Sequence, residues 1–375
     1  MSYRGRFEQP KPKKKRGGKI VLIILAVLLV LVIGAVIAGV VYYNSILGKL
    51  DQVVVPKIEY TTAPTEAVET SETTTAVTET TGATTVVTTE PPHIPSSADY
   101  INILLVGQAS RAGEDERFAD TMILCTVNTY EKSLTLTSFL RDSFAKMPDY
   151  KGRIGGRIKL TTIYHLGSVY GDGAAGSMEL MNQALYDNFG VEVDHNIEVD
   201  FDMVIDAIDL LGGVGVELTQ AEADYLNEQD AWVSYDVEPG YFWLDGAGAL
   251  CYARMRKAEG DGDSDIKRTS RQRTLIEALV GRLKKMSLSD VQNLANQILP
   301  MITTSMSNQE ITDMLLTMLP MLPDLTIVSN GTCPAEGWGD EVDIYSDGMY
   351  HSVMRFDAAK EKKLMRAVTE GEIAE

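Results

Sequence analysis

An uninterrupted apolar run near the start of the chain limits its topology more than any other feature. Ile20 to Tyr43 comprises 24 residues without a charged side chain. As a helix, this run would extend ~36 Å, enough to cross the ~30 Å hydrocarbon core of a bilayer. It is too long for an ordinary signal peptide, and no clear small-residue cleavage site follows it. We therefore expect residues 20–43 to form an uncleaved transmembrane anchor helix.

The residues before this run indicate its orientation. Residues 1–19 contain eight Lys and Arg side chains and one acidic residue, Glu8, so this segment carries a charge of +7. Basic flanks of membrane helices stay in the cytoplasm. We expect a single-pass protein of the cell membrane, with residues 1–19 as a basic cytoplasmic tail and the rest outside. The whole chain carries −19, so the remainder carries −26, and such an acidic body argues against nucleic-acid binding.

A threonine-rich tract separates the expected anchor from the folded body. Thr61 to Ser97 contains too few large apolar residues to form a core. Residues 44–97 are therefore predicted to be a disordered extracytoplasmic linker. The three cysteines and four histidines show no metal-ligand spacing. Cys125 is expected to be a buried small hydrophobic residue, and a disulfide between two of the three cysteines stays open.

From Asp99 onward, the pattern predicts an α/β fold with a central mixed sheet and helices on both faces. Apolar runs predict strands at Ile101–Gly107, Thr121–Val127, Leu134–Phe139, Asn196–Val199 and Val214–Leu218, and a strand or hairpin within Ile344–Met354. Helical spacing predicts helices at Ser177–Phe189, Phe201–Leu211, Asp245–Tyr252, Asp265–Lys285, Leu288–Leu299 and Ala358–Val368, and one opened by a capping box at Ser307 and ending near Leu319. Residues 98–325 would form the main folded domain, and residues 326–375 a C-terminal extension packed on it.

A basic cluster stands out against the acidic body. Arg254 and Arg256 precede a helix expected to begin at Asp265, and this helix places Asp265, Arg268 and Arg271 near one face. Planar guanidinium groups bind phosphate oxygens bidentately, and several of them around a carboxylate would hold a polyanion together with a divalent metal. The cluster predicts a phosphate or pyrophosphate site. The alternative is a solvated helix face with surface salt bridges.

Other residues could belong to the same site. Asp120 opens the second predicted strand, Arg141 and Asp142 follow the third strand, and Lys159 precedes a predicted helix. Strand ends often carry the site residues of open α/β sheets. Each residue also has a purely structural interpretation: Asp120 as a turn or cap residue, Arg141 with Asp142 as a local ion pair, and Lys159 as a solvated charge.

Together these residues resemble the LytR-CpsA-Psr family of Gram-positive cell-envelope proteins. The resemblance covers about residues 100–320 and rests on Asn102-x-Leu104-Leu105-x-Gly107, Asp120-Thr121, Arg141-Asp142, Lys159, Leu211-Gly212-Gly213-Val214, Ala249-Leu250-x-Tyr252-x-Arg254-x-Arg256 and Asp265-x-x-Arg268-x-x-Arg271-Gln272. The family typically has a short basic tail, one membrane helix and an external catalytic domain. Leu140, Ala119 and Ala109 depart from its usual pattern, which bears on loop geometry and acceptor choice.

The resemblance implies phosphotransfer. Family members are understood to move an anionic glycopolymer, such as a teichoic acid or capsular polysaccharide, from an undecaprenyl-pyrophosphate carrier onto peptidoglycan, forming a phosphodiester. By matching position, the pyrophosphate would be held by Arg141, Arg254, Arg256, Arg268 and Arg271, with Lys159 and Gln272 as further substrate-binding residues. Asp120 and Asp265 would hold Mg²⁺ (or Mn²⁺), and Asp142 would orient Arg141 or activate the acceptor.

Two other functions would use the same residues. A pyrophosphatase acting on polyprenyl pyrophosphates would replace the glycan acceptor by water, and an envelope sensor would bind lipid-linked polyanions without turnover. A polyprenyl tail would also need an apolar channel. The helices expected at 177–189 and 201–211 are candidates for its walls, although core packing explains their apolar pattern as well.

Overall fold

The computed structural model describes residues 51–58, 96–108, 117–256, 265–287, 290, 293–294, 297–298, 301–346 and 348–371. The expected tail, the expected anchor, most of the linker and the loop 259–264 lie outside these ranges, as does most of the helix predicted at 288–299. Within the described ranges, no helix is both long enough and apolar enough to cross a membrane. The described residues belong to one compact unit, Leu50–Glu375.

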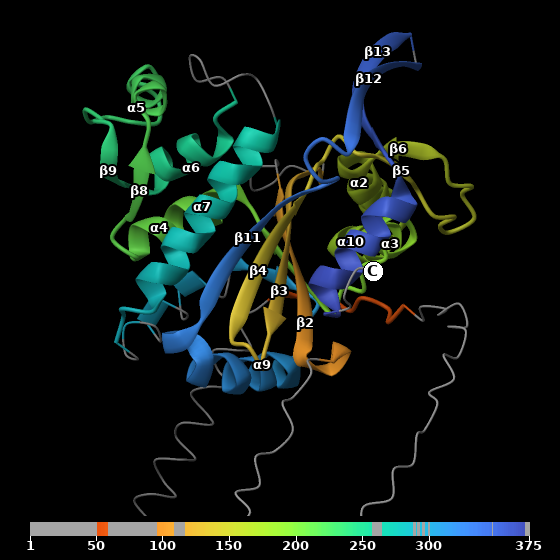
Figure 1. Ribbon diagram of the computed structural model, residues 1–375, viewed down its shortest axis with the longest axis horizontal. Coiled ribbons are helices and arrows are strands. Elements are labelled where there is room, and N and C mark those ends of the chain that lie inside the picture. Colours follow the sequence, from red (N-terminus) through yellow and green to blue (C-terminus); the bar gives the residue numbers. More distant parts are fainter. Residues whose placement is uncertain are drawn as a thin grey trace, which may run out of the picture. The chain divides into compact units, whose positions relative to one another are not determined.

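A mixed seven-stranded sheet lies at the centre of this unit, with strand order β1-β10-β7-β2-β3-β4-β11 (Figure 1). The strands are β1 (Asp51–Gln52), β2 (Tyr100–Gln108), β3 (Ala119–Asn128), β4 (Ser133–Phe139), β7 (His195–Val199), β10 (Thr303–Thr304) and β11 (Thr326–Cys333). β3 is antiparallel to both β2 and β4, whereas β7 is parallel to β2 and β11 is parallel to β4. The carboxyl ends of these four parallel strands and the amino end of β3 therefore share one edge of the sheet. Asp120 and Arg141 lie at this edge.

Helices cover both faces of the sheet, as predicted (Figure 1). One face packs against α2 (Leu160–Tyr170), α3 (Gly173–Phe189) and α10 (Ala358–Thr369), and the other against α7 (Asp265–Leu283) and α9 (Asn308–Met321). Neighbouring residues of β3 serve opposite faces, because side chains alternate along a strand. Leu124 packs in the core with Phe189, whereas Ile123 packs with Met321.

A second core lies beyond α7. It contains α4 (Phe201–Leu210), α5 (Gln220–Asn227), α6 (Gly246–Arg254) and the two-stranded sheet of β8 (Val214–Leu218) and β9 (Gly240–Leu244). α4, β8 and α6 agree with the predicted elements, whereas α5 and β9 were not predicted. A smaller hairpin of β5 (Phe144–Lys146) and β6 (Arg157–Lys159) lies between β4 and α2 in the sequence. The 3-10 helices are η1 (Ser97–Asp99) and η3 (Leu322–Asp324).

Residues after 325 complete this fold. β11 is the edge strand beside β4, α10 packs on α3, and β12 (Gly339–Ser346) with β13 (Met349–Phe356) forms the predicted hairpin. The three cysteines are free thiols. Cys125 packs against the core on the α7 face, and burial raises the pKa of its thiol to about 12.

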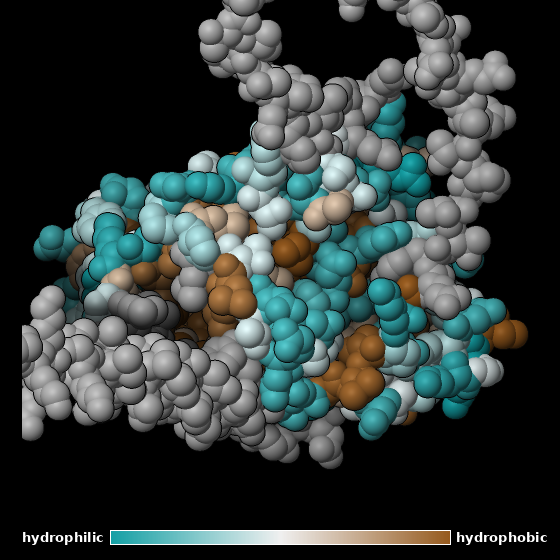
Figure 2. Space-filling view, turned by 90° about the horizontal axis from the view of Figure 1, so that it is seen from below, coloured by the Kyte–Doolittle hydropathy of each residue, from teal (hydrophilic) through white to brown (hydrophobic). Residues whose placement is uncertain are grey.

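Asp120 lies at the beginning of β3, whereas α9 lies at the end of the sheet where β3 ends (Figure 1). Figure 2 views the unit from this end and shows hydrophobic residues in separate patches between hydrophilic ones. Leu315 and Leu316 of α9 are among the exposed apolar side chains. Apolar side chains scattered in this way are usual on the surfaces of globular proteins.

The predicted capping box opens α9, and it makes stability depend on pH. The Ser307 backbone N–H donates to Glu310 Oε2 at 2.8 Å, and the Glu310 N–H donates to Ser307 Oγ at 3.3 Å. The hydrogen bond from the Ser307 backbone lowers the pKa of the Glu310 carboxyl. A carboxyl whose pKa is lower in the folded state than in the unfolded state stabilises the fold at pH values above its unfolded-state pKa. This stabilisation is lost as the pH falls through the folded-state pKa.

We therefore expect Glu310→Gln to lower the free energy of unfolding by about 0.5 kcal/mol at neutral pH, a small value because water screens this exposed carboxylate. The difference from the wild type should vanish in acid, where the carboxyl is protonated in both states. Chemical denaturation at neutral and acidic pH measures it. Asp313→Asn removes a charge from the same helix outside the capping box and serves as the control. An identical pH dependence of the two variants would contradict the prediction.

Candidate active site

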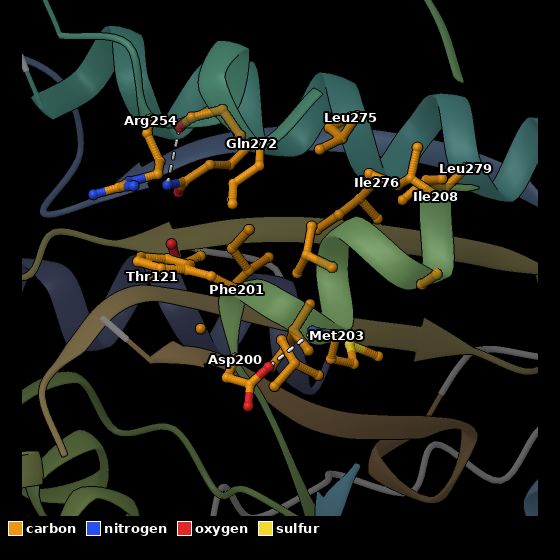
Figure 3. A pocket seen from close by; sticks show the side chains of 18 residues that line it. Thr121, Asp200, Phe201, Met203, Ile208, Arg254, Gln272, Leu275, Ile276 and Leu279 are labelled. Carbon is orange, nitrogen blue, oxygen red and sulfur yellow. Dashed lines mark hydrogen bonds between the residues drawn. The ribbon is translucent and has the colours of Figure 1, made fainter. Parts of the chain in front are cut away.

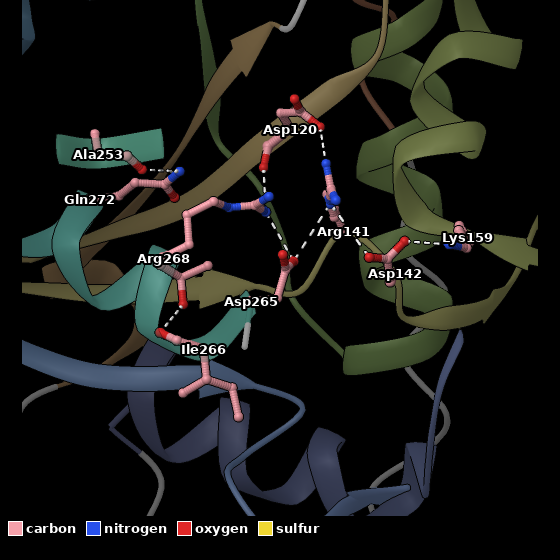
Figure 4. A network of polar contacts seen from close by, with 10 residues as sticks. Asp120, Arg141, Asp142, Lys159, Ala253, Asp265, Ile266, Arg268 and Gln272 are labelled. Atoms are coloured by element: carbon pink, nitrogen blue, oxygen red, sulfur yellow. Dashed lines mark hydrogen bonds and ion pairs between the residues drawn. The ribbon is translucent and has the colours of Figure 1, made fainter. Parts of the chain in front are cut away.

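Two aspartates and two arginines from three segments meet at the edge of the sheet (Figure 4). Asp120 lies in β3, Arg141 follows β4, and Asp265 and Arg268 lie in the first turn of α7. Arg141 Nη1 donates to Asp120 Oδ1 at 2.5 Å, and Arg141 Nε lies 3.6 Å from Asp265 Oδ2. Arg268 Nη2 donates to Asp265 Oδ2 at 2.9 Å and to the Asp120 carbonyl at 3.2 Å. Alternating charges therefore join β3, β4 and α7.

A further ion pair extends this network toward α2. Asp142 Oδ1 accepts from Lys159 Nζ at 2.6 Å, and Asp142 Oδ2 lies 3.4 Å from Arg141 Nε. Lys159 is the last residue of β6 and is fixed there by its pairing with Phe144 in β5. Six of the residues predicted from the sequence thus form one connected group. We call it the arginine–aspartate cluster: Asp120, Arg141, Asp142, Lys159, Asp265 and Arg268.

The inner part of the cluster is strongly desolvated. Burial raises the pKa of the Asp265 carboxyl, although Arg268 and Arg141 oppose this shift, and burial lowers the pKa of Arg268. The Arg268 side chain is only 4% exposed. In the described part of the chain, Nε of Arg141 and Nε of Arg268 are buried without a hydrogen-bond partner. Incompletely satisfied buried charges are costly, and they are more typical of binding sites than of passive ion pairs.

Arg254 and Arg256 are exposed at the end of α6. The guanidinium carbon of Arg254 lies 4.4 Å from the centre of the Phe201 ring and 5.6 Å from that of Trp232. These cation–π contacts hold the guanidinium group in place and leave it open to solvent. Arg256 acts on the cluster electrostatically. Burial has the largest effect on the pKa values of Asp265 and Arg268, and the positive charge of Arg256 makes a smaller contribution that lowers both. Both arginines can therefore approach a ligand from the solvent side.

Among the described residues, Arg271 contacts Glu222 and Met255 and not its predicted neighbours. Its Nε donates to Glu222 Oε1 at 2.7 Å, its Nη1 donates to the Met255 carbonyl at 3.2 Å, and its side chain is 5% exposed. The predicted convergence on one spot is therefore wrong for Arg271, because its long side chain turns toward α5, where Glu222 supplies a carboxylate. Gln272 turns toward α6 instead, and its Nε2 lies 3.4 Å from the Ala253 carbonyl.

An apolar cavity of about 220 Å³ adjoins the cluster (Figure 3). Met203 and Ile208 of α4 face Leu275 and Leu279 of α7 across it. The lining also contains four polar side chains, namely Thr121, Asp200, Arg254 and Gln272. Gln272 lies one helical turn after Arg268 on α7, and Thr121 follows Asp120 in β3. The cavity and the cluster therefore lie next to each other at the sheet edge.

Only one of the two helices predicted to wall an apolar channel lines this cavity. α4 does so, as predicted. For residues 177–189 the structure confirms the other explanation given for their apolar pattern, core packing, because Leu180, Leu185 and Phe189 of α3 are fully buried against the opposite face of the sheet. An apolar helical pattern does not distinguish a core from a cavity wall.

Three residues that support the site were not predicted. Glu222 binds Arg271, and Phe201 and Trp232 hold Arg254. Glu222 also closes a capping box with Thr219 at the start of α5, and this Thr-x-x-Glu spacing could have located that helix. No local spacing signals the contact between Trp232 and Arg254, because it forms between separate segments of the chain.

The predicted metal ligands, Asp120 and Asp265, are connected through Arg141. Across the described ranges, no three or more His, Cys, Asp or Glu residues are grouped so as to hold a metal ion. Asp120 and Asp265 both contact Arg141. Their side chains are 30% and 22% exposed, so both carboxylates remain partly accessible to solvent.

An α/β fold with an arginine–aspartate cluster beside an apolar cavity defines a protein suited to bind an amphiphilic anion. The chain belongs to the LytR_cpsA_psr family, whose family model matches residues 59–357. It is 32% identical over 189 residues to polyisoprenyl-teichoic acid–peptidoglycan teichoic acid transferase TagU of Oceanobacillus iheyensis, an alignment that covers 50% of this chain and 53% of the relative. The chain thus spans about half the length of the curated relatives it matches.

Solved structures support the fold. One is TagT bound to LIIa-WTA, with a TM-score of 0.54 and 22% identity, covering 74% of this chain and 92% of that chain. Another is the LytR-CPS2A-psr family protein YwtF (TagT) with bound octaprenyl pyrophosphate lipid, with a TM-score of 0.50 and 19% identity, covering 73% of this chain and 95% of that chain. At these identities the likeness establishes the shared fold.

Proposed function

We propose that the chain is a membrane-anchored phosphotransferase that moves an anionic glycopolymer, of the teichoic acid or capsular polysaccharide type, from an undecaprenyl-pyrophosphate carrier to peptidoglycan. The observation that carries this proposal is that the apolar cavity, lined by Thr121 and Gln272, lies next to the arginine–aspartate cluster. A polyprenyl pyrophosphate has a charged head and an apolar tail, which match these two surfaces. The name of the TagU relative and the octaprenyl pyrophosphate in the TagT structure support this choice of substrate.

The transfer requires a hydroxyl of the acceptor to attack the phosphorus that carries the glycopolymer. A new P–O bond forms, the bond from this phosphorus to the bridging oxygen breaks, and polyprenyl phosphate leaves with the electron pair. The hydroxyl proton passes to water or to a carboxylate. Arg141 and Arg268 would donate to the phosphate oxygens, where negative charge develops, and the exposed Arg254 and Arg256 would add to this from the solvent side. Asp142, held between Lys159 and Arg141, is best placed to orient these two cations.

Asp120 and Asp265 fit a divalent cation. Burial raises the pKa of Asp265 even with two arginines nearby, so further positive charge is favoured at this carboxylate. Two carboxylates together with substrate phosphate oxygens and water form a ligand set that Mg²⁺ accepts. When bound by Asp120 and Asp265, Mg²⁺ (or Mn²⁺) would neutralise negative charge on the pyrophosphate.

The proposal places residues 1–19 in the cytoplasm, residues 20–43 in the membrane and the folded unit outside the cell. The uncharged run and the basic residues before it support this arrangement. The threonine-rich tract would reach about 35 Å on average as a flexible coil. The site would therefore stay near the membrane that holds its lipid-linked donor.

The test is a transfer assay with the full-length chain in detergent. The reaction contains a short saccharide linked to a lipid pyrophosphate, peptidoglycan oligomers and Mg²⁺. We expect acceptor-linked phosphodiester with the wild type and none with Arg254→Ala or Asp120→Ala. Release of lipid phosphate at the same rate without acceptor would indicate a pyrophosphatase. Tight lipid binding without any product, equal in the wild type and Asp120→Ala, would indicate a sensor.

Filling the apolar cavity should impair use of the lipid donor. Ala207 of α4 lines the cavity, and Ala207→Phe would place a phenyl ring where we expect the polyprenyl chain. We expect KM for a long-chain donor to rise by about tenfold or more, whereas KM for a water-soluble short-chain donor should change little. The control is Ala359→Phe on the exposed side of α10. An equal rise in KM for both donors would contradict this role of the cavity.

A further inference from the structure

The outer face of the small sheet β8–β9 carries two exposed aromatic rings. Phe242 and Leu244 turn into the core, so Tyr241 and Trp243 turn outward, because side chains alternate along a strand. The exposed fractions of Tyr241 and Trp243 are 71% and 44%. This face is separate from the arginine–aspartate cluster and from the apolar cavity.

Glycines of β8 and the turn before it allow both rings to lie across the sheet. Gly215 is paired with Trp243. A Cβ on Gly215 would lie 2.1 Å from Tyr241 Oη and 2.9 Å from Trp243 Cε3, and a Cβ on Gly213 would lie 2.3 Å from Trp243 Nε1. Any larger residue at these positions would collide with the rings. Together Tyr241 and Trp243 form what we call the aromatic platform.

The indole ring of the platform is held in a fixed orientation. Trp243 Nε1 donates to the Gly212 carbonyl at 2.7 Å, and the guanidinium carbon of Arg282 lies 5.2 Å from the ring centre. Nearly half of this side chain nevertheless remains in contact with solvent. A large aromatic ring that is rigid and exposed at the same time is a feature of binding surfaces.

A cavity of about 240 Å³ adjoins the platform, and its lining includes Trp243, Tyr235, Asp209 and Asp245. Asp209 Oδ1 accepts from the Gly246 N–H at 2.7 Å, and Asp245 Oδ1 accepts from the Gly248 N–H at 2.8 Å. Among the described residues, Oδ2 of neither aspartate has a hydrogen-bond partner. The cavity therefore combines one wall of indole with free carboxylate acceptors.

We propose that this face binds pyranose rings of a neutral or amino-sugar glycan. The C–H face of a pyranose is flat and apolar and matches an exposed aromatic ring, while sugar hydroxyl and amino groups supply donors for the carboxylate oxygens. Asp209 and Asp245 disfavour a polyanion by charge repulsion. The identity of the bound glycan as the peptidoglycan acceptor, and not the anionic polymer, rests on the proposed function.

The position of the platform suits an acceptor. α6 begins directly after Asp245 at this cavity and ends at Arg254, which lines the apolar cavity next to the cluster. Its nine residues extend about 13 Å at the rise of an α-helix. Most of α6 is buried, so its length gives the separation of its two ends and not the path of the glycan. A few sugar residues can cover this separation, so a glycan chain on the platform would reach the phosphate site.

The inference is tested by calorimetric titration of the full-length chain with a tetramer of β-1,4-linked N-acetylglucosamine, in the absence of any lipid donor. We expect Tyr241→Ala and Trp243→Ala each to weaken binding by about tenfold. Gly215→Ala keeps both rings but displaces Tyr241, and it should weaken binding as well. Tyr350→Ala, at a residue 74% exposed on the β12–β13 hairpin, should bind like the wild type. Thermal melting verifies that each variant is folded.

The inference is overturned if the wild type does not bind the tetramer, or if the folded platform variants bind it like the wild type. Preferential binding of soluble polyglycerol phosphate that is lost in Trp243→Ala would also overturn it. The proposed function can fail separately, since tetramer binding that depends on Tyr241 would stand even if no transfer occurs. Conversely, transfer with an acceptor KM unchanged in Tyr241→Ala would leave the transferase intact and remove the platform from its mechanism.

Discussion

Arg141→Ala is expected to reduce transfer of the glycopolymer by about 10²–10³-fold. The Arg141 guanidinium lies 2.5 Å from Asp120, 3.4 Å from Asp142 and 3.6 Å from Asp265. Its removal takes one donor from the phosphate in the transition state, and loss of one such donor in a preorganised site has an effect of about this size. It also leaves three carboxylates without the cation that they share, so their mutual repulsion opposes approach of the pyrophosphate. Single-turnover measurement with saturating donor isolates the effect on the chemical step.

Two variants separate this role from a general effect of charge. Arg141→Lys keeps the charge but loses the planar fork that contacts several acceptors at once, so it should recover only part of the rate. Arg153→Ala removes an arginine that lies over the Tyr170 ring at 4.6 Å, outside the cluster, and it should transfer at the wild-type rate. Equal losses in Arg141→Ala and Arg153→Ala would contradict a specific role of Arg141.

The central fold was predictable because its strands and helices carry strong local patterns. β2 and β3 are long apolar runs, and Ser307 with Glu310 marks the start of α9. β9 was missed because its apolar run, Tyr-Phe-Trp-Leu, is only four residues long, and so short a run does not distinguish a strand from a helix segment or a turn. Only the packing of Phe242 and Leu244 against the second core distinguishes the inner from the outer side chains of this strand.

The cluster was predictable to the extent that it depends on helix spacing and strand ends. Asp265 and Arg268, three residues apart, form the expected ion pair at 2.9 Å. The same three-residue spacing did not predict the partner of Arg271. Spacing gives the face of the helix on which a residue lies, but not the residue that its long side chain contacts. Glu222 lies 49 residues away from Arg271 in the sequence, and only the tertiary fold brings the two together.

Arg271→Ala should lower the free energy of unfolding by about 3–5 kcal/mol, because it leaves the carboxylate of Glu222 buried without its cation. Arg271 Nε lies 2.7 Å from Glu222 Oε1, and both side chains are at most 10% exposed. Urea denaturation measures the change. The double variant Arg271→Met, Glu222→Gln removes both charges and should be less destabilised than Arg271→Ala, since no unpaired buried charge remains.

Arg271→Ala and the double variant also show whether Arg271 has a structural role or binds the pyrophosphate. If the ion pair is structural, transfer activity will follow the folded fraction, and the double variant will retain activity wherever it is folded. If Arg271 acts on the pyrophosphate, as the resemblance implies, the double variant will be folded and inactive. The contacts favour the first outcome, because Arg271 directs its Nε to Glu222 and its Nη1 to the Met255 carbonyl. These bonds fix the start of the loop after α6 to α7, so Arg271 would act by positioning Arg254 and Arg256.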